Sequence, residues 1–252
     1  MQISTIIMNP SRFDRVKFSE SDLGIEIQTF PQHKLDTDYD DLIKLWNDKL
    51  VDFNQPISLH GSSFDLNPGS TDQKIIEVTK YRYLQSIDIA KKVNAKYVIF
   101  HSQTNPLLSV KRIRKMKSDN QINFWIDLLE KEIPSDICIL IENEYDDTFD
   151  DIKSICDGVG KSNFGVCLDV GHVLAYSKIS LEEWISNLGK SIKYIHLHWN
   201  DGKTDEHNEP SNSELLILKN LLLKYNLSPI ITLEYYSEDI YNEVQRVREY
   251  IE

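Results

Sequence analysis

Eight short apolar runs rich in β-branched residues recur along the chain, and each ends in polar or small residues. They cover Ile3–Met8, Ile25–Phe30, Ile57–His60, Tyr97–His101, Ile137–Glu142, Gly165–Asp169, Tyr194–His198 and Ile230–Glu234. None repeats its apolar residues at the spacing of an amphipathic helix, so we interpret these runs as buried strands.

Amphipathic segments lie between most of these runs. The segment Asp36–Leu50 begins with acidic residues, which the positive end of a helix dipole favours. Other segments repeat apolar residues on one helical face: Ile76, Tyr83, Ile87 and Ala90 within Thr71–Asn94, then Ile122, Ile126 and Leu129, and finally Ile240, Val244, Val247 and Ile251. Capping-box spacing, which marks helix starts, occurs at Ser180 with Glu183 and at Ser211 with Glu214.

Strands that alternate with helices predict right-handed βαβ units and a parallel sheet. Eight such units in 252 residues are typical of a (β/α)8 TIM barrel, an α/β fold, and we predict a single domain over residues 1–252. A doubly wound open sheet is the alternative. The chain contains neither GxGxxG nor GxxxxGK, the phosphate loops that such a sheet often carries, and this favours the barrel.

The stretch FGVCLDVGH, residues 164–172, indicates where the chemistry is located. A buried apolar run ends there in Asp169, and His172 follows just after a glycine. A carboxylate oxygen and an imidazole nitrogen at this spacing can converge on one zinc or manganese ion. The alternative is that Asp169 caps the following turn and His172 is merely exposed.

Residues of the same kind end six successive runs: His60, His101, Glu142, Asp169, His198 and Glu234. In a barrel these positions are C-terminal strand ends, which face the one mouth where the active site lies. Six of the seven histidines, all but His33, fall at or beside these ends. The sequence therefore predicts a metal site at the mouth.

The two glutamates give the strongest indication. Glu142 and Glu234 stand in apolar strands, where a buried carboxylate without a partner is costly and a metal would remove that cost. For His101 the alternative is a hydrogen-bonded core histidine. His60 is open to both interpretations.

Two further pairs of residues leave alternatives open. His196 and His198 point to the same side of one strand, because side chains alternate. We select His198 as the metal ligand because it is nearer the strand end, and His196 would then support it or pack. Asp205 and His207 are either ordinary loop residues or ligands of a further cation.

The composition of the chain indicates a class of protein and disfavours some partners. The chain is 40% hydrophobic and 27% charged, as soluble globular proteins are, and no apolar run is long enough to span a bilayer. Its start, MQISTIIMNPSRFD, lacks the basic region of a signal peptide. Three cysteines without a CxxC pair indicate reduced thiols and a cytoplasmic location. The net charge of −12 disfavours nucleic acid, whose phosphates are normally met by a basic field.

The order H…H…E…DxxH…H…DxH…E resembles the xylose isomerase-like TIM-barrel superfamily, which holds sugar and sugar-phosphate isomerases and epimerases and also endonuclease IV. By motif the resemblance extends from Ile57 to Tyr235. It implies that the single metal of the epimerases is held here by Glu142, Asp169, His198 and Glu234. The larger set is similar in order to the trinuclear zinc ligands of endonuclease IV: those four residues with His60, His101, His172, Asp205 and His207. The segment HWNDGK also resembles the strand-seven motif of that enzyme.

Departures from the pattern bear on the substrate. After His207 the chain reads NEPSNSE, without the glycines of the PxGxG segment that usually follows in the family. Glu206 stands where the endonuclease has a basic residue, and basic loops for grasping DNA are not evident. The missing basic loops count against a DNA substrate.

The resemblance implies a divalent-metal-dependent isomerase or epimerase that acts on a small sugar or sugar phosphate, with one to three zinc or manganese ions. The metal would stabilise an ene-diolate, Glu142 and Glu234 would shuttle protons on opposite faces of the substrate, and His172 or His101 would bind its hydroxyls. One alternative is an endonuclease IV-like multinuclear zinc phosphodiesterase of AP endonuclease family 2. Another is a barrel that binds metal or ligand without turnover. The sequence leaves the oligomeric state open.

Overall fold

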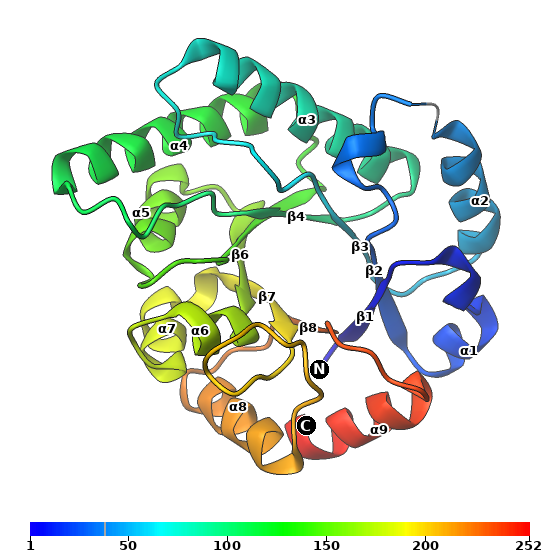
Figure 1. The fold of residues 1–252 in the computed structure, drawn as a ribbon. Helices are drawn as coiled ribbons and strands as arrows, with labels where there is room; N and C mark the ends of the chain where they lie inside the picture. Colours follow the sequence, from blue (N-terminus) through cyan, green and yellow to red (C-terminus); the bar gives the residue numbers. More distant parts are fainter. Residues whose placement is uncertain (38) are drawn as a thin grey trace.

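A computed structural model describes residues 1–37 and 39–252, and its eight strands close into one parallel barrel (Figure 1). The strands are β1 (Ile3–Ile7), β2 (Leu23–Ile27), β3 (Ile57–His60), β4 (Tyr97–His101), β5 (Cys138–Glu142), β6 (Phe164–Asp169), β7 (Ile192–Leu197) and β8 (Ile230–Leu233). Neighbours in the barrel are neighbours in the chain, and β8 closes the barrel on β1. The prediction of a TIM barrel is confirmed.

Helices surround the barrel and cover the outer faces of its strands (Figure 1). They are α1 (Arg15–Glu20), α2 (Asp40–Leu50), α3 (Gln73–Lys92), α4 (Lys111–Lys131), α5 (Asp150–Val159), α6 (Val170–Tyr176), α7 (Leu181–Leu188), α8 (Asn212–Lys224) and α9 (Ile240–Ile251). Both predicted capping boxes are present, with Ser180 starting α7 and Ser211 starting α8. The predicted start of the helix over 36–50 includes residue 38, which lies outside the described residues.

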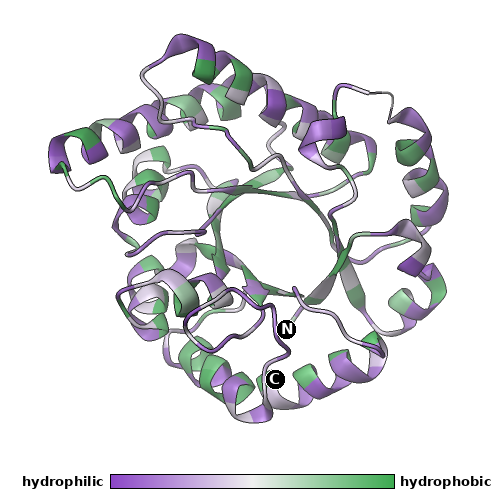
Figure 2. Ribbon diagram, viewed as in Figure 1, coloured by the Kyte–Doolittle hydropathy of each residue, from purple (hydrophilic) through white to green (hydrophobic). Residues whose placement is uncertain are grey.

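The alternation of strand residues separates two apolar regions, and the barrel strands are largely hydrophobic in Figure 2. Outward residues such as Ile139 and Ile141 of β5 belong to the main core between strands and helices. The inward Leu140 packs instead with Ile99, Cys167 and Tyr194 inside the barrel. The polar residues at the strand ends lie next to this apolar layer, on its C-terminal side.

A bulge sets the level of the site residues on β7. Val166 pairs with Ile192 but Cys167 pairs with Tyr194, so one extra residue is accommodated in β7. Beyond the bulge His196 is level with Asp169 on the neighbouring strand. The register therefore brings an imidazole beside a carboxylate at the end of the barrel.

Two properties of the described chain concern its environment. No helix within residues 1–37 and 39–252 is long and apolar enough to cross a membrane. Cys138, Cys156 and Cys167 are free, and burial raises the pKa of each thiol, most clearly for Cys167. A raised pKa keeps a thiol in its protonated, less reactive form.

Candidate metal centre

The imidazole of His196 lies in the barrel mouth between three buried carboxylates. Its Nε2 is 2.9 Å from Glu26 Oε2, and its Nδ1 is 2.9 Å from Glu142 Oε1 and 2.8 Å from Glu234 Oε2. Burial lowers the pKa of His196, but the surrounding acidic groups raise it well above its ordinary value. In the metal-free protein these surroundings favour the protonated ring, and a metal ion bound to the ring would displace that proton.

Glu142 and Glu234 are ionised although both are buried. Burial raises the pKa of Glu142, but His196 outweighs burial and holds that pKa well below its usual range. His196 likewise outweighs the effect of burial on Glu234 and lowers the pKa of that carboxyl to about 2. Near neutral pH both side chains are therefore carboxylates, able to accept a proton or to ligate a cation.

A second group of side chains forms on the other oxygen of Glu142. Its Oε2 lies 3.3 Å from His60 Nε2 and 3.7 Å from His101 Nε2. The remaining nitrogen of His101, Nδ1, lies 3.1 Å from Glu144 Oε2. Burial lowers the pKa of His60, but the contact with Glu142 raises it to about 9. Glu142 thus joins two clusters of potential ligands.

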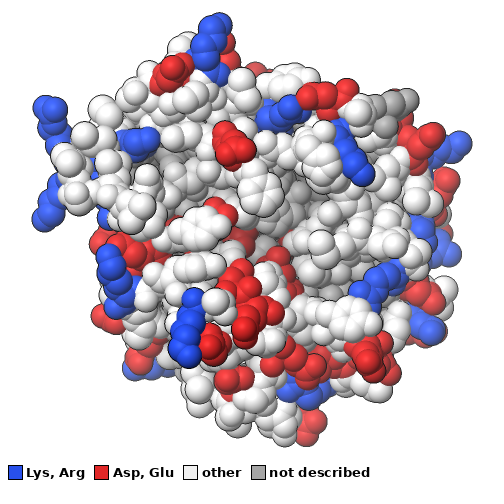
Figure 3. Space-filling model, viewed as in Figure 1, with Lys and Arg blue, Asp and Glu red and all other residues white. Residues whose placement is uncertain are grey.

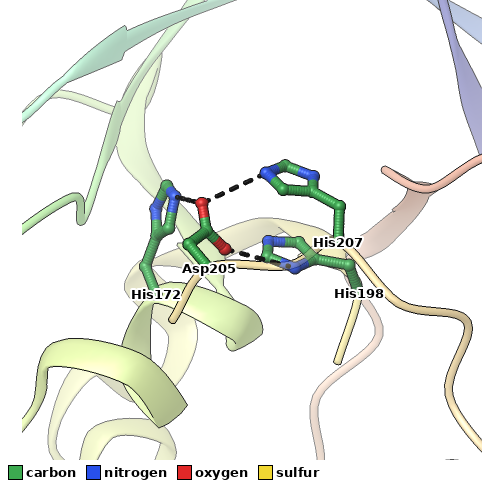
Figure 4. A group of neighbouring side chains, drawn as sticks. All are labelled: His172, His198, Asp205 and His207. Carbon is green, nitrogen blue, oxygen red and sulfur yellow. Dashed lines mark hydrogen bonds and ion pairs between the residues drawn. The ribbon is translucent and has the colours of Figure 1, made fainter. Parts of the chain in front are cut away.

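A third group gathers on Asp205 in the loop after β7 (Figure 4). Asp205 Oδ2 is 3.2 Å from Nε2 of both His172 and His207, and its Oδ1 is 3.6 Å from Nδ1 of His198. The rings of His198 and His207 stack with centroids 3.9 Å apart. Burial raises the pKa of Asp205, but its two histidine partners lower it far below the ordinary value.

Asp169 takes part in two contacts at the end of β6. Its Oδ1 accepts a 2.6 Å hydrogen bond from the backbone N–H of His172, which caps α6, and it also lies 3.0 Å from His198 Nε2. The capping role considered from the sequence is therefore present. His172, however, is buried rather than exposed.

The residues at the mouth fit a divalent cation. Ligand atoms lie within 4.8 Å of one another in three groups, namely His60, His101 and Glu142; Glu142, Asp169, His196 and Glu234; and His172, His198, Asp205 and His207. Several of these atoms are buried and form ion-pair contacts but no hydrogen bond of good geometry, including Glu142 Oε2, Glu234 Oε2 and His198 Nδ1. Buried polar atoms are normally hydrogen-bonded, so these atoms have capacity left to bind a cation. Nitrogen and oxygen donors in this mixture suit zinc or manganese.

All nine predicted ligands lie at this end of the barrel, but His196 in β7 and His198 just after it divide differently from the expected arrangement. His196 is the imidazole among Glu142, Asp169 and Glu234, whereas His198 belongs to the group on Asp205 and reaches only Asp169 of the others. Strand alternation puts both rings inside the barrel. Their depth is set by the register of β7, which the sequence pattern does not reveal.

Two residues of β2 and its end were missed by the sequence reasoning. Glu26 is fully buried and contacts His196, and Gln28 donates hydrogen bonds to Glu26 Oε1 at 2.9 Å and to Glu234 Oε1 at 3.2 Å. Glu26 stands inside the apolar run LGIEI, the same signal that singled out Glu142. It was overlooked because it does not end the run.

Carboxylate side chains lie beside six histidines at the mouth. In Figure 3 they gather beside and within the central hollow, whereas lysine and arginine side chains lie mainly toward the edge of this face. Cations are drawn into such a field, and polyanions are repelled by it.

Comparison with known proteins identifies the family. Residues 23–252 match the family model described as xylose isomerase-like TIM barrel. The chain belongs to this family. A curated relative, an uncharacterized protein of Methanocaldococcus jannaschii, is 25% identical over 158 residues, which are 60% of this chain and 54% of that protein.

Solved structures share the fold over nearly the whole chain. A Thermus thermophilus protein, soaked with ZnCl2, is 17% identical with a TM-score of 0.72, covering 99% of this chain and 97% of that one. A D-tagatose 3-epimerase-like protein is 19% identical with a TM-score of 0.71, covering 99% and 95%. D-allulose 3-epimerase from Methylomonas sp., in complex with D-allulose, is 14% identical with a TM-score of 0.69, covering 100% and 96%. Sugar epimerases are thus among the structural neighbours.

Proposed function

We propose that this protein is a divalent-metal-dependent isomerase or epimerase of sugars or sugar phosphates. The observation that carries the proposal is the placement of Glu142 and Glu234. Glu142 ends β5 and Glu234 directly follows β8. Both are buried and ionised, and both approach the same nitrogen of His196. The family and the epimerases among the structural neighbours support the same reaction class.

The cation would be held by Glu142, Asp169 and Glu234, together with His198 or His196. When bound, a divalent ion chelates a carbonyl and its neighbouring hydroxyl and acidifies the proton on the adjacent carbon. Glu142 and Glu234 would then accept and return that proton on opposite faces of the substrate.

The remaining mouth residues would bind and orient the substrate. His172 and His101 would hold its hydroxyls, and the buried walls of the mouth would keep water from the reacting carbon. We also propose zinc or manganese in one to three sites and a cytoplasmic location, the latter because the three cysteines are unpaired.

The test is solvent deuterium exchange, followed by NMR on metal-loaded protein, with D-fructose, D-tagatose, D-allulose and their 6-phosphates. Wild type should incorporate deuterium next to the carbonyl of at least one sugar. Glu142→Gln and Glu234→Gln should each slow exchange by roughly 100-fold or more, the usual contribution of a general base. Glu77→Gln, on the exposed face of α3, is the matched control and should exchange at the wild-type rate. No exchange by wild type across the panel would contradict the proposal.

A second function is favoured by one observation, the two ligand groups beyond the central one. Three clusters joined through Glu142 and Asp169 would suit a multinuclear zinc phosphodiesterase, in which the ions held by these residues would lower the pKa of a water that attacks phosphorus. The acidic mouth and the net charge of −12 oppose a nucleic-acid substrate and place this function second. Two or three zinc ions per chain, together with cleavage of an oligonucleotide containing an abasic site, would reverse the order. Metal binding without either activity would indicate a non-catalytic barrel.

A further inference from the structure

A second cavity adjoins the metal centre. It has a volume of about 500 Å³ and lies between the end of β1 and the segment after β8. The neighbouring cavity, of about 610 Å³, contains His60 and His101. Gln28 and Glu234 line both cavities, so the two spaces meet at the metal centre. A substrate held there can extend from one into the other.

The second cavity has a mainly apolar lining. Ile7, Phe18 and Ile240 form part of its wall, and Met8 and Tyr236 lie at its rim. Met8 is 70% exposed and Tyr236 is 69% exposed. Large apolar side chains left open to water beside a polar site mark a surface that a ligand covers.

An arginine side chain lies at this rim. The Arg12 guanidinium lies over the ring of Tyr236, 4.8 Å from its centroid, and Nη2 donates a weak hydrogen bond of 3.5 Å to the carbonyl of Ser237. Within residues 1–37 and 39–252, Arg12 forms no ion pair with a carboxylate, although acidic residues outnumber basic ones by 40 to 28. Most of its five N–H donors are therefore available to a ligand. The ring of Tyr236 keeps the guanidinium in place beside the cavity.

We propose that this cavity binds the part of the substrate distant from the reacting carbon, and that this part is an apolar group carrying a single anionic substituent, a phosphate or a carboxylate. The apolar group fills the space beside Phe18 and Ile240, and the anion pairs with Arg12. The inference rests on the proposed isomerase or epimerase function and narrows its substrate class. A polyanion would instead be repelled by the acidic side chains at the mouth.

The test uses small probes of the cavity and isothermal titration calorimetry on the metal-loaded protein. Phenyl phosphate and benzoate carry the two anions, benzenesulfonate carries a third, and benzyl alcohol is the neutral match. At least one anionic probe should bind fivefold or more tightly than benzyl alcohol, and comparison of phosphate with carboxylate identifies the preferred anion. Arg12→Met should abolish that preference, so that the anionic and neutral probes bind with similar affinity. Arg112→Met, on the exposed surface of α4, is the charge-matched control and should behave as wild type.

The outcomes separate this inference from the proposed function. Equal binding of neutral and anionic probes, or an anion preference that survives Arg12→Met, would overturn the inference even if sugars exchange deuterium. Arg12-dependent binding without deuterium exchange in any sugar would leave the anion site in place and contradict the reaction. A faster exchange with a 6-phosphate than with the free sugar, lost in Arg12→Met but not in Arg112→Met, would support the reaction and the pairing of an anion with Arg12.

Discussion

Glu26 on β2 and His196 on β7 meet inside the barrel, with the carboxylate Oε2 2.9 Å from the imidazole Nε2. They are 170 residues apart in the chain, and both are fully buried. The contact occupies one ring nitrogen and thereby directs the other, Nδ1, toward Glu142 and Glu234. A carboxylate in this position orients a histidine for a metal and increases its basicity.

Glu26→Gln should weaken metal binding by about 10- to 100-fold, the usual effect of removing such an outer carboxylate. The amide keeps an oxygen for the hydrogen bond but removes the negative charge. Titration of zinc and manganese into metal-free protein measures the effect, and Glu249→Gln on the exposed side of α9 is the control. Wild-type affinity in the Glu26 variant would show that Glu26 has no such role. Chemical unfolding of each variant separates lost affinity from lost fold.

Gly171→Ala should displace His198. A Cβ at position 171 would come within 1.9 Å of His198 Cε1, and that ring is fully buried and held by Asp169. Alanine favours a helix, but overpacking of this kind costs about 1–3 kcal/mol and exceeds the gain. We expect a lower free energy of unfolding and weaker metal binding.

The control for this substitution is Gly158→Ala in α5, where the three atoms nearest to an added Cβ all belong to the side chain of Ile122. It should leave metal affinity unchanged. If Gly171→Ala matches it in both stability and affinity, then His198 has more freedom than its burial indicates.

Replacing Asp205 by Asn together with His207 by Ala separates the two enzyme proposals. Both residues lie beyond β7 and belong to the group around Asp205. An isomerase working on the central ion should retain that ion and proton exchange, with weaker substrate binding. A multinuclear phosphodiesterase should lose metal and turnover together. Metal analysis and both assays are compared with Asp201→Asn, an exposed change in the same loop.

Asp147 should make the protein sensitive to acid. Burial raises its pKa, but ion pairs with Lys178 at 2.7 Å and Arg114 at 3.2 Å lower it below the ordinary value. A depressed folded-state pKa contributes stability that is present above the unfolded pKa of about 3.9 and is lost as pH falls through the folded value.

Asp147→Asn should therefore reduce the free energy of unfolding by about 1–2 kcal/mol above pH 5, and by progressively less below pH 4. Urea unfolding at a series of pH values measures the difference, with the exposed Asp48→Asn as the control. A deficit that does not shrink in acid would mean that the ion pairs are not its source.

Local pattern alone determined the barrel and the end at which its chemistry is located. Short apolar runs form strands that are buried on both faces, and capping boxes such as Ser180 with Glu183 start helices. Parallel strands in a barrel bring their C-terminal ends together. The polar residues that end those runs were therefore predictable as neighbours. The spacing of the apolar runs and of the polar residues that end them can be read from the sequence alone.

Only the tertiary structure decided how these residues group. A bulge in β7 sets the depth of His196 and His198, and a contact across the barrel recruits Glu26 from the middle of an apolar run. The cavity beside Arg12 forms between the end of β1 and the segment after β8, which lie at opposite ends of the chain. Register, depth and cavities depend on how distant segments pack, and a one-residue shift in pairing changes them without altering the apolar pattern of any single run.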